Sequence, residues 1–344
     1  MRFQPILGSV AALACLASPA LAEDCGPLKQ ITSIDMTAGP GGRYLVPVTV
    51  NGAPQTMLLN TAGGITTLRR DSADAMGLHA IDASRIKLLS SNGTASEKFA
   101  QMDFQLGAIH FPDLQLIVMP KVGDGTPPFV GSLAGDILEH YDVEMDFAGR
   151  KLNFFSKDHC PGKVIYWKAD AYAVVPVTLQ IPTPDDSRRG FRPYSPRGSH
   201  INVPVTINGK NLTAALNTSS LPSTMSTDTA KYMFGVTAES PGAVPIESPD
   251  GDPRHRMFRY TFPSLTFDEV TVSNAKFLIY PNLTGTKDPN NDFRTGTRIG
   301  RVDDGFGGRT TIGLEVLRKL RLYVAYGERK LYITPASAPQ AATQ

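Results

Sequence analysis

The sequence has few of the residues that build metal and redox centres. It contains three cysteines among 344 residues, and its six histidines are scattered along the chain. No two of these histidines have the His-x-x-x-His spacing of a zinc site, and no cysteine-rich cluster replaces it. We therefore expect neither a metal nor another cofactor.

Two common catalytic loops are also missing. The glycine-rich segment Gly305-Phe306-Gly307-Gly308 lacks the lysine and the spacing of a phosphate-binding loop. The chain contains no Gly-x-Ser-x-Gly turn of the kind that carries the nucleophile of an α/β-hydrolase. Nucleotide hydrolysis and this type of serine hydrolysis are not indicated.

An excess of charge of one sign is absent as well, since the formal net charge is only +2. Four arginines gather between residues 188 and 197, but the other basic residues are spread out. Nucleic acid is therefore not an expected partner.

Long apolar runs are confined to the beginning of the chain. Arg2, the apolar stretch 6–16 and the small residues Ala20-Leu21-Ala22 have the order of a signal peptide, predicted over residues 1–22. No later stretch approaches the roughly 20 apolar residues of a membrane-spanning helix. We expect an exported protein, periplasmic or secreted. Lipid attachment at Cys15 is the alternative, although Ala12-Leu13-Ala14 is a poor lipidation signal.

Removing the leader leaves one pair of cysteines, Cys25 and Cys160, each beside turn-forming residues. In an oxidising compartment an even pair of this kind predicts a disulfide. Two unrelated thiols are the alternative.

An internal repeat organises the rest of the chain. Val-Pro-Val-Thr-Val-Asn-Gly at 46–52 returns as Val-Pro-Val-Thr-Ile-Asn-Gly at 203–209, and Leu59-Asn60-Thr61 returns at the same offset as Leu216-Asn217-Thr218. Two matches in one register predict two homologous lobes. We place the lobes at 30–157 and 196–336, a linker with a Pro- and Arg-rich loop at 158–195, and a disordered tail at 337–344.

The pattern inside each lobe is mostly that of β-strands. Hydrophobic residues alternate with polar ones over residues 44–50, 98–106, 114–119, 200–207 and 276–280. Hairpin turns are expected at Asn51-Gly52, Asn92-Gly93, Asn208-Gly209 and Asp250-Gly251. Short helices are expected near 72–76, 137–141, 227–233 and 314–320.

These repeated segments resemble the retropepsin and pepsin type of aspartic protease, in a single-chain form with two lobes. In that family each lobe carries Asp-Thr-Gly after a strand, then a flap hairpin, then two hydrophobic residues and a glycine. The matching segments here are 58–63, 91–94 and 133–138 in the first lobe, and 215–220, 249–251 and 311–317 in the second. The resemblance implies a mostly β, two-lobed aspartic-protease fold.

The chain departs from the family at the residues that do the chemistry. Asn60 and Asn217 stand where the resemblance places the two catalytic aspartates, and the next glycine is replaced by Ala62 and Ser219. Asparagine does not titrate near neutral pH, so two amides cannot share the proton that the aspartates share. We predict Asn60 and Asn217 to be an inactive dyad facing each other across a pseudo-two-fold axis.

Other roles follow from the same resemblance. Thr61 and Thr218 are expected to exchange hydroxyl hydrogen bonds between the lobes. Ligand contacts are expected from Thr61, Ala62, Thr218, Ser219 and the flap residues Asn92, Gly93, Asp250 and Gly251. Asp136 and Glu315 lie beside the glycine motifs. We interpret both as helix-start residues rather than as substitute catalytic groups.

The predicted function is that of a pseudoprotease, a monomer that binds an extended peptide or protein segment in the cleft between its lobes. The alternative is an active aspartic-type endopeptidase that hydrolyses peptide bonds.

Overall fold

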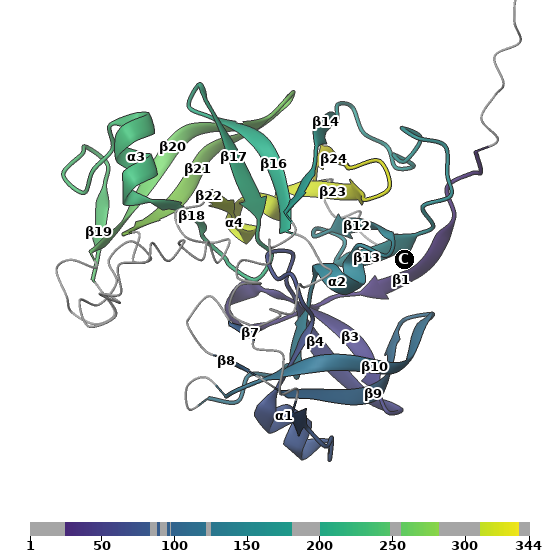
Figure 1. Ribbon diagram of the computed structural model, residues 1–344. Coiled ribbons are helices and arrows are strands. Elements are labelled where there is room, and N and C mark those ends of the chain that lie inside the picture. The colour runs from purple at the N-terminus through teal and green to yellow at the C-terminus, as the bar shows by residue number, and fades with distance from the viewer. Residues whose placement is uncertain are drawn as a thin grey trace, which may run out of the picture.

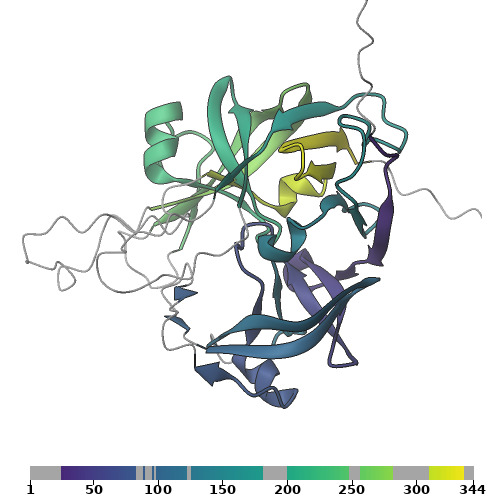
Figure 2. The same cartoon turned by 45° about the vertical axis from the view of Figure 1, so that its right-hand side comes forward.

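The computed structural model describes residues 25–82, 88–89, 95–96, 98–121, 125–180, 200–247, 256–281 and 310–336. These residues form two β lobes with a third sheet between them (Figures 1 and 2). The mostly β, two-lobed fold predicted from the sequence is confirmed. Its helices are short and lie at the ends of strands.

The first lobe is an eight-stranded sheet in the order β2-β3-β4-β11-β5-β10-β9-β6, with β3 also paired to β9. Its strands are β2 (Thr37–Ala38), β3 (Tyr44–Val50), β4 (Ala53–Leu59), β5 (Thr67–Arg69), β6 (Ile81–Asp82), β9 (Lys98–Leu106), β10 (Ile109–Met119) and β11 (Gly131–Leu133). The short pair β7 (Leu88–Leu89) and β8 (Ala95–Ser96) and the 3-10 turn η1 (Pro40–Gly42) complete this lobe.

The second lobe repeats this arrangement as β15-β16-β17-β22-β18-β21-β20-β19, with β16 also paired to β20. Its strands are β15 (Thr178–Gln180), β16 (His200–Ile207), β17 (Lys210–Leu216), β18 (Ser223–Ser226), β19 (Val244–Ile246), β20 (Met257–Phe267), β21 (Val270–Tyr280) and β22 (Thr310–Ile312). The matching strand order shows that the repeated sequence motifs belong to two copies of one structural unit.

The turns that the repeat predicted are present where the structure describes them. Asn51 and Gly52 have φ of 48° and 79°, and Asn208 and Gly209 have 44° and 77°. Two consecutive residues with positive φ are typical of a tight hairpin turn, which explains the Asn-Gly sequence at both places. The other two predicted turns, Asn92-Gly93 and Asp250-Gly251, lie outside the described residues.

The helices are α1 (Arg70–Ala75), α2 (Gly135–Leu138), α3 (Thr227–Phe234) and α4 (Leu314–Leu317). The predictions for α2 and α4 extended too far toward the C-terminus, because the chain turns at once into the next strands. Leu320, predicted as the end of a helix, instead begins strand β23. Helix α3 matches its prediction closely, since Ser226 caps its first turn and Gly235 ends it with φ of 67°.

The third sheet joins the two lobes. Its order is β1-β13-β12-β23-β24-β14, built from β1 (Gln30–Asp35), β12 (Asp142–Asp146), β13 (Lys151–Phe155), β14 (Ala173–Pro176), β23 (Leu320–Ala325) and β24 (Lys330–Pro335). In the middle of this sheet the antiparallel pair β12 and β23 brings the two halves of the chain together. The segment predicted as a linker also contributes, because β14 pairs with β24 and β15 pairs with β16.

A disulfide fastens the edge of this sheet. Cys25 and Cys160 are bonded, with their Cα atoms 4.7 Å apart. The bridge ties the segment before β1 to the segment after β13, and it confirms the pairing predicted from the sequence.

Buried charged groups join the strands of the shared sheet. Asp142 of β12 lies 2.7 Å from Nε2 of His159 and also accepts a hydrogen bond from the backbone N of Gly327 in the β23–β24 turn. Burial raises the pKa of Asp142, although the bonds from His159 and Gly327 act in the opposite direction. The hydrogen bond to Gly327 connects the first half of the chain to the second inside the sheet.

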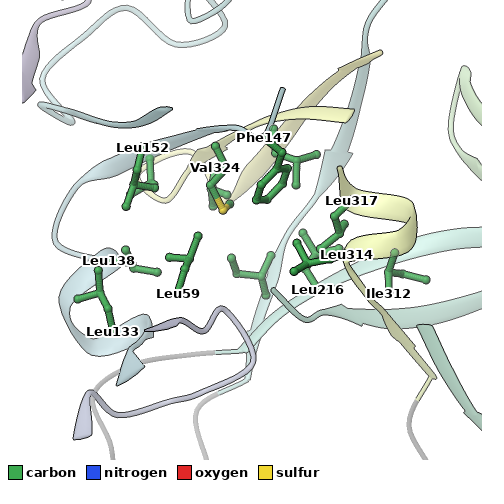
Figure 3. Packing of buried hydrophobic residues seen from close by; sticks show 14 of the residues in the cluster. Leu59, Leu133, Leu138, Phe147, Leu152, Leu216, Ile312, Leu314, Leu317 and Val324 are labelled. Atoms are coloured by element: carbon green, nitrogen blue, oxygen red, sulfur yellow. The ribbon is translucent and has the colours of Figure 1, made fainter. Parts of the chain in front are cut away.

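The hydrophobic core also continues from one lobe to the other. Figure 3 shows Leu59 and Leu216, the residues before the two asparagines, in one cluster of buried hydrophobic residues. The first lobe contributes Leu133 and Leu138, the second contributes Ile312, Leu314 and Leu317, and the shared sheet with its β12–β13 turn contributes Phe147, Leu152 and Val324. Packing of this kind gives the two asparagines a rigid base.

Candidate functional site

Asn60 and Asn217 occupy equivalent places in the two lobes. Each directly follows a strand, β4 or β17, that pairs in parallel with a short strand from the end of its lobe. The backbone N of Asn60 donates to the carbonyl of Leu133 at 2.9 Å, and the backbone N of Asn217 donates to the carbonyl of Ile312 at 2.9 Å. The two-fold repeat of the sequence is therefore repeated in the hydrogen bonds that position these residues.

The threonines that follow the asparagines hold the two lobes together. The hydroxyl of Thr218 accepts from the backbone N of Thr61 at 3.0 Å and donates to the carbonyl of Leu59 at 2.9 Å. In return, the hydroxyl of Thr61 accepts from the backbone N of Thr218 at 3.2 Å and donates to the carbonyl of Leu216 at 2.9 Å. Both threonines are buried. Because each asparagine precedes one of them, these four bonds bring the two asparagine turns together between the lobes.

Replacing Thr218 by valine should destabilise the protein by about 2–3 kcal/mol, because the backbone N of Thr61 and the carbonyl of Leu59 would then be buried without a partner. The measurement is the free energy of unfolding in urea. The control is Thr271→Val, whose hydroxyl bonds Thr266 on the exposed surface of strands β20 and β21, and which should change stability by less than about 0.5 kcal/mol. Equal losses in the two variants would contradict this assignment.

The side chain of Asn217 is held in one orientation by Ser219. Oδ1 of Asn217 accepts from the backbone N of Ser219 at 3.0 Å and from its hydroxyl at 2.8 Å. A backbone N–H only donates, so the atom facing it has to be the amide oxygen. The NH₂ group of Asn217 therefore points away from this turn.

The first lobe lacks such a partner for Asn60. Ala62 occupies the place of Ser219 and has no hydroxyl, and Oδ1 of Asn60 is buried without a hydrogen-bond partner among the described residues. The NH₂ group lies against Gly63, where an added Cβ would stand 2.6 Å from Nδ2. Gly63 thus makes room for the amide of Asn60, whereas the second lobe has Ser220 at the equivalent position.

Asp136 has a structural role that the sequence did not reveal. Its Oδ1 accepts from the backbone N of Thr66 at 2.8 Å and from the Thr66 hydroxyl at 2.6 Å. The same hydroxyl accepts from the backbone N of Ala134, and Gly135 donates its N–H to the carbonyl of Gly63. Burial raises the pKa of Asp136, and the bonds from Thr66 only partly offset this effect. The carboxylate therefore braces the turn around Asn60.

Glu315 has no matching role in the second lobe. Its backbone N donates to the carbonyl of Leu221, and the hydroxyl of Ser223 accepts from the backbone N of Gly313. The second lobe thus braces its turn with a serine where the first uses Thr66 together with a carboxylate.

The remaining predicted ligand contacts, Asn92, Gly93, Asp250 and Gly251, lie outside the described residues. Among the residues that are described, no group of three His, Cys, Asp or Glu side chains is arranged to hold a metal ion. In the same part of the chain no helix has the length and apolar character needed to cross a membrane.

Comparison with known proteins found a matching family model and similar solved structures. Residues 46–135, which include Asn60, match the model of a family described as aspartyl protease. The fold is similar to that of the aspartic proteinase from Irpex lacteus, with a TM-score of 0.50 and 14% identity over 91% of this chain and 99% of that one. Basic 7S globulin from soybean was also found, with a TM-score of 0.48 and 10% identity over 92% of this chain and 98% of that one. A search of curated protein sequences found no match.

Proposed function

Because the chain has the two-lobed fold of the aspartic proteinases, we propose that it is an exported pseudoprotease that binds an extended peptide or protein segment between its lobes without cleaving it. The observation that carries the proposal is the pair Asn60 and Asn217 at the two dyad positions, joined by the hydrogen bonds of Thr61 and Thr218. The hydrogen bonds that join the two turns support this proposal, and the titratable groups of the family are replaced at both positions.

The chemistry of the dyad explains why binding would remain after catalysis is lost. In an aspartic protease one carboxylate activates water while the other carboxyl group protonates the substrate carbonyl. Neither step is open to a side-chain amide, which does not gain or lose a proton near neutral pH. Main-chain hydrogen bonds to an extended peptide do not depend on those protons.

Export is supported by two features. The disulfide between Cys25 and Cys160 favours an oxidising compartment, periplasmic or extracellular. The first 22 residues, which lie outside the described part of the chain, have the composition of a signal peptide.

The test uses the protein from residue 23 onward and a pooled library of synthetic eight-residue peptides with amidated C-termini, at pH values from 3 to 8. Mass spectrometry should recover bound peptides intact, with no cleavage products in the pool. Cleavage that is lost in Asn60→Ala and Asn217→Ala would instead support the alternative, an active aspartic-type endopeptidase. Cleavage that persists in both variants would show that the catalytic residues lie elsewhere in the protein.

A further inference from the structure

The orientation of the two side-chain amides decides what a ligand meets at the dyad. Oδ1 of Asn217 is taken up by the N–H and hydroxyl of Ser219, and Oδ1 of Asn60 is buried. Neither oxygen is therefore free to accept a hydrogen bond from a ligand. What each side chain still offers is its NH₂ group.

Both NH₂ groups are accessible in the described part of the chain. Asn60 and Asn217 are partly exposed, and neither Nδ2 donates a hydrogen bond to another described residue. Neither Nδ2 is among the buried side-chain atoms that lack a partner, although Oδ1 of Asn60 is. Solvent therefore reaches both nitrogen atoms.

The charged groups bonded to the two turns do not compete for these donors. The Nε of Arg43 donates to the carbonyl of Ser219 at 2.7 Å, and Oδ1 of Asp136 is already occupied by Thr66. Among the described residues, no carboxylate forms a hydrogen bond with either asparagine amide.

From this geometry we propose that Asn60 and Asn217 form a two-donor site for an acceptor oxygen of a peptide, either a main-chain carbonyl or a C-terminal carboxylate. This inference rests on the proposed function and adds the chemical group that is recognised. Two aspartates that share one proton offer a single O–H donor, several acceptor oxygens and negative charge, whereas the two asparagines offer N–H donors and no charge. The substitution therefore replaces a charged and mainly accepting site by an uncharged and donating one, in addition to removing its proton chemistry.

The experiment measures the dissociation constant of the tightest library peptide that has only neutral side chains and an amidated C-terminus. Asn60→Asp and Asn217→Asp each replace one donor by a carboxylate oxygen of nearly the same shape. At pH 7 each variant should bind about tenfold more weakly or worse, because an unpaired acceptor then faces the ligand oxygen. At pH 3 binding should recover in Asn60→Asp, since the buried oxygen position without a partner favours the protonated carboxyl group, which donates again. Asn217→Asp should stay weak at pH 3, because the two hydrogen bonds from Ser219 favour its charged form.

The matched control is Asn208→Asp, which makes the same change of charge in the exposed turn at the other end of β17. Seven residues of strand separate this turn from Asn217, which is roughly 20 Å or more. This variant should bind like the wild-type protein at both pH values. The free-acid form of the same peptide identifies the source of the oxygen: a C-terminal carboxylate is indicated if it binds more tightly at pH 7 than the amide, and a main-chain carbonyl if the two bind equally.

The outcomes separate this inference from the function on which it rests. If the wild-type protein binds no peptide, both fail. If it binds and the two aspartate variants bind equally well at pH 7, only the two-donor site is overturned. A loss of binding by Asn60→Asp that persists at pH 3 also overturns it, because it would mean that this substitution acts on the structure of the turn.

Discussion

The double variant Asn60→Asp/Asn217→Asp is expected to cleave peptides at acid pH, at a rate at least roughly a hundredfold above that of the wild-type protein. General acid–base catalysis typically contributes a factor of about a hundred to ten thousand, and the variant restores both partners. Two neighbouring carboxyl groups cannot easily both ionise, so the rate should follow a bell-shaped pH profile. The measurement is peptide cleavage from pH 3 to 8, followed by mass spectrometry.

The surroundings of the two positions predict which restored carboxyl group acts as the base and which acts as the acid. A carboxylate at position 217 would accept two hydrogen bonds from Ser219, which favours its charged form. A carboxyl group at position 60 would place an oxygen in a buried spot without a partner, which favours the protonated form. Position 217 is therefore expected to supply the base and position 60 the acid.

The single variants are the controls, and each should remain as inactive as the wild-type protein because one carboxyl group has no partner with which to share a proton. Recovery in the double variant should be incomplete, since Ala62 and Ser219 carry side chains where the family has glycines that let the backbone approach closely. Equal cleavage by a single variant and the double variant would contradict the shared-proton explanation.

The sequence repeat predicted the centre of the molecule well, because that centre is built from short motifs that occur in both halves of the chain. The 157-residue offset placed Asn60 with Asn217 and Thr61 with Thr218, and the structure joins both threonines by four hydrogen bonds. Two short motifs in each lobe are enough to position its asparagine, because their strands pair in parallel. The backbone N of Asn60 donates to Leu133, and that of Asn217 donates to Ile312, both shortly before a glycine of the repeated motif.

The side-chain hydrogen bonds that stabilise the two asparagine turns were not predictable from the repeat. Thr66 and Asp136 are 70 residues apart. The second lobe has other residue types at the two equivalent positions, Ser223 and Glu315. The orientation of the Asn217 amide depends on Ser219, but the sequence alone showed only that a glycine was missing there. Long-range contacts between unlike side chains leave no periodic signal in one sequence.

The same limitation applies to the buried charges of the shared sheet. Glu144 on β12 is completely buried, and its carboxylate accepts from Nε of Arg321 on β23, from the hydroxyl of Tyr166 and, at 2.9 Å, from Nδ2 of Asn153. The guanidinium of Arg321 lies 4.3 Å from the ring centre of Trp167, which shields it from water. This ion pair crosses the junction between the two halves of the chain.

Replacing Arg321 by methionine should therefore destabilise the protein by about 3–5 kcal/mol, because it leaves the Glu144 carboxylate buried without its counter-charge. The double variant Glu144→Gln/Arg321→Met should recover much of that loss, since it removes both charges together. The control is Lys151→Met in the same sheet, whose partner Asp35 is 79% exposed, and which should cost less than about 1 kcal/mol. Urea unfolding of the wild-type protein, the single variants Arg321→Met, Glu144→Gln and Lys151→Met, and the double variant measures these differences. A double variant that loses as much as the sum of its single changes would show that the charges contribute independently, and that the pair does not act as one unit at the junction of the lobes.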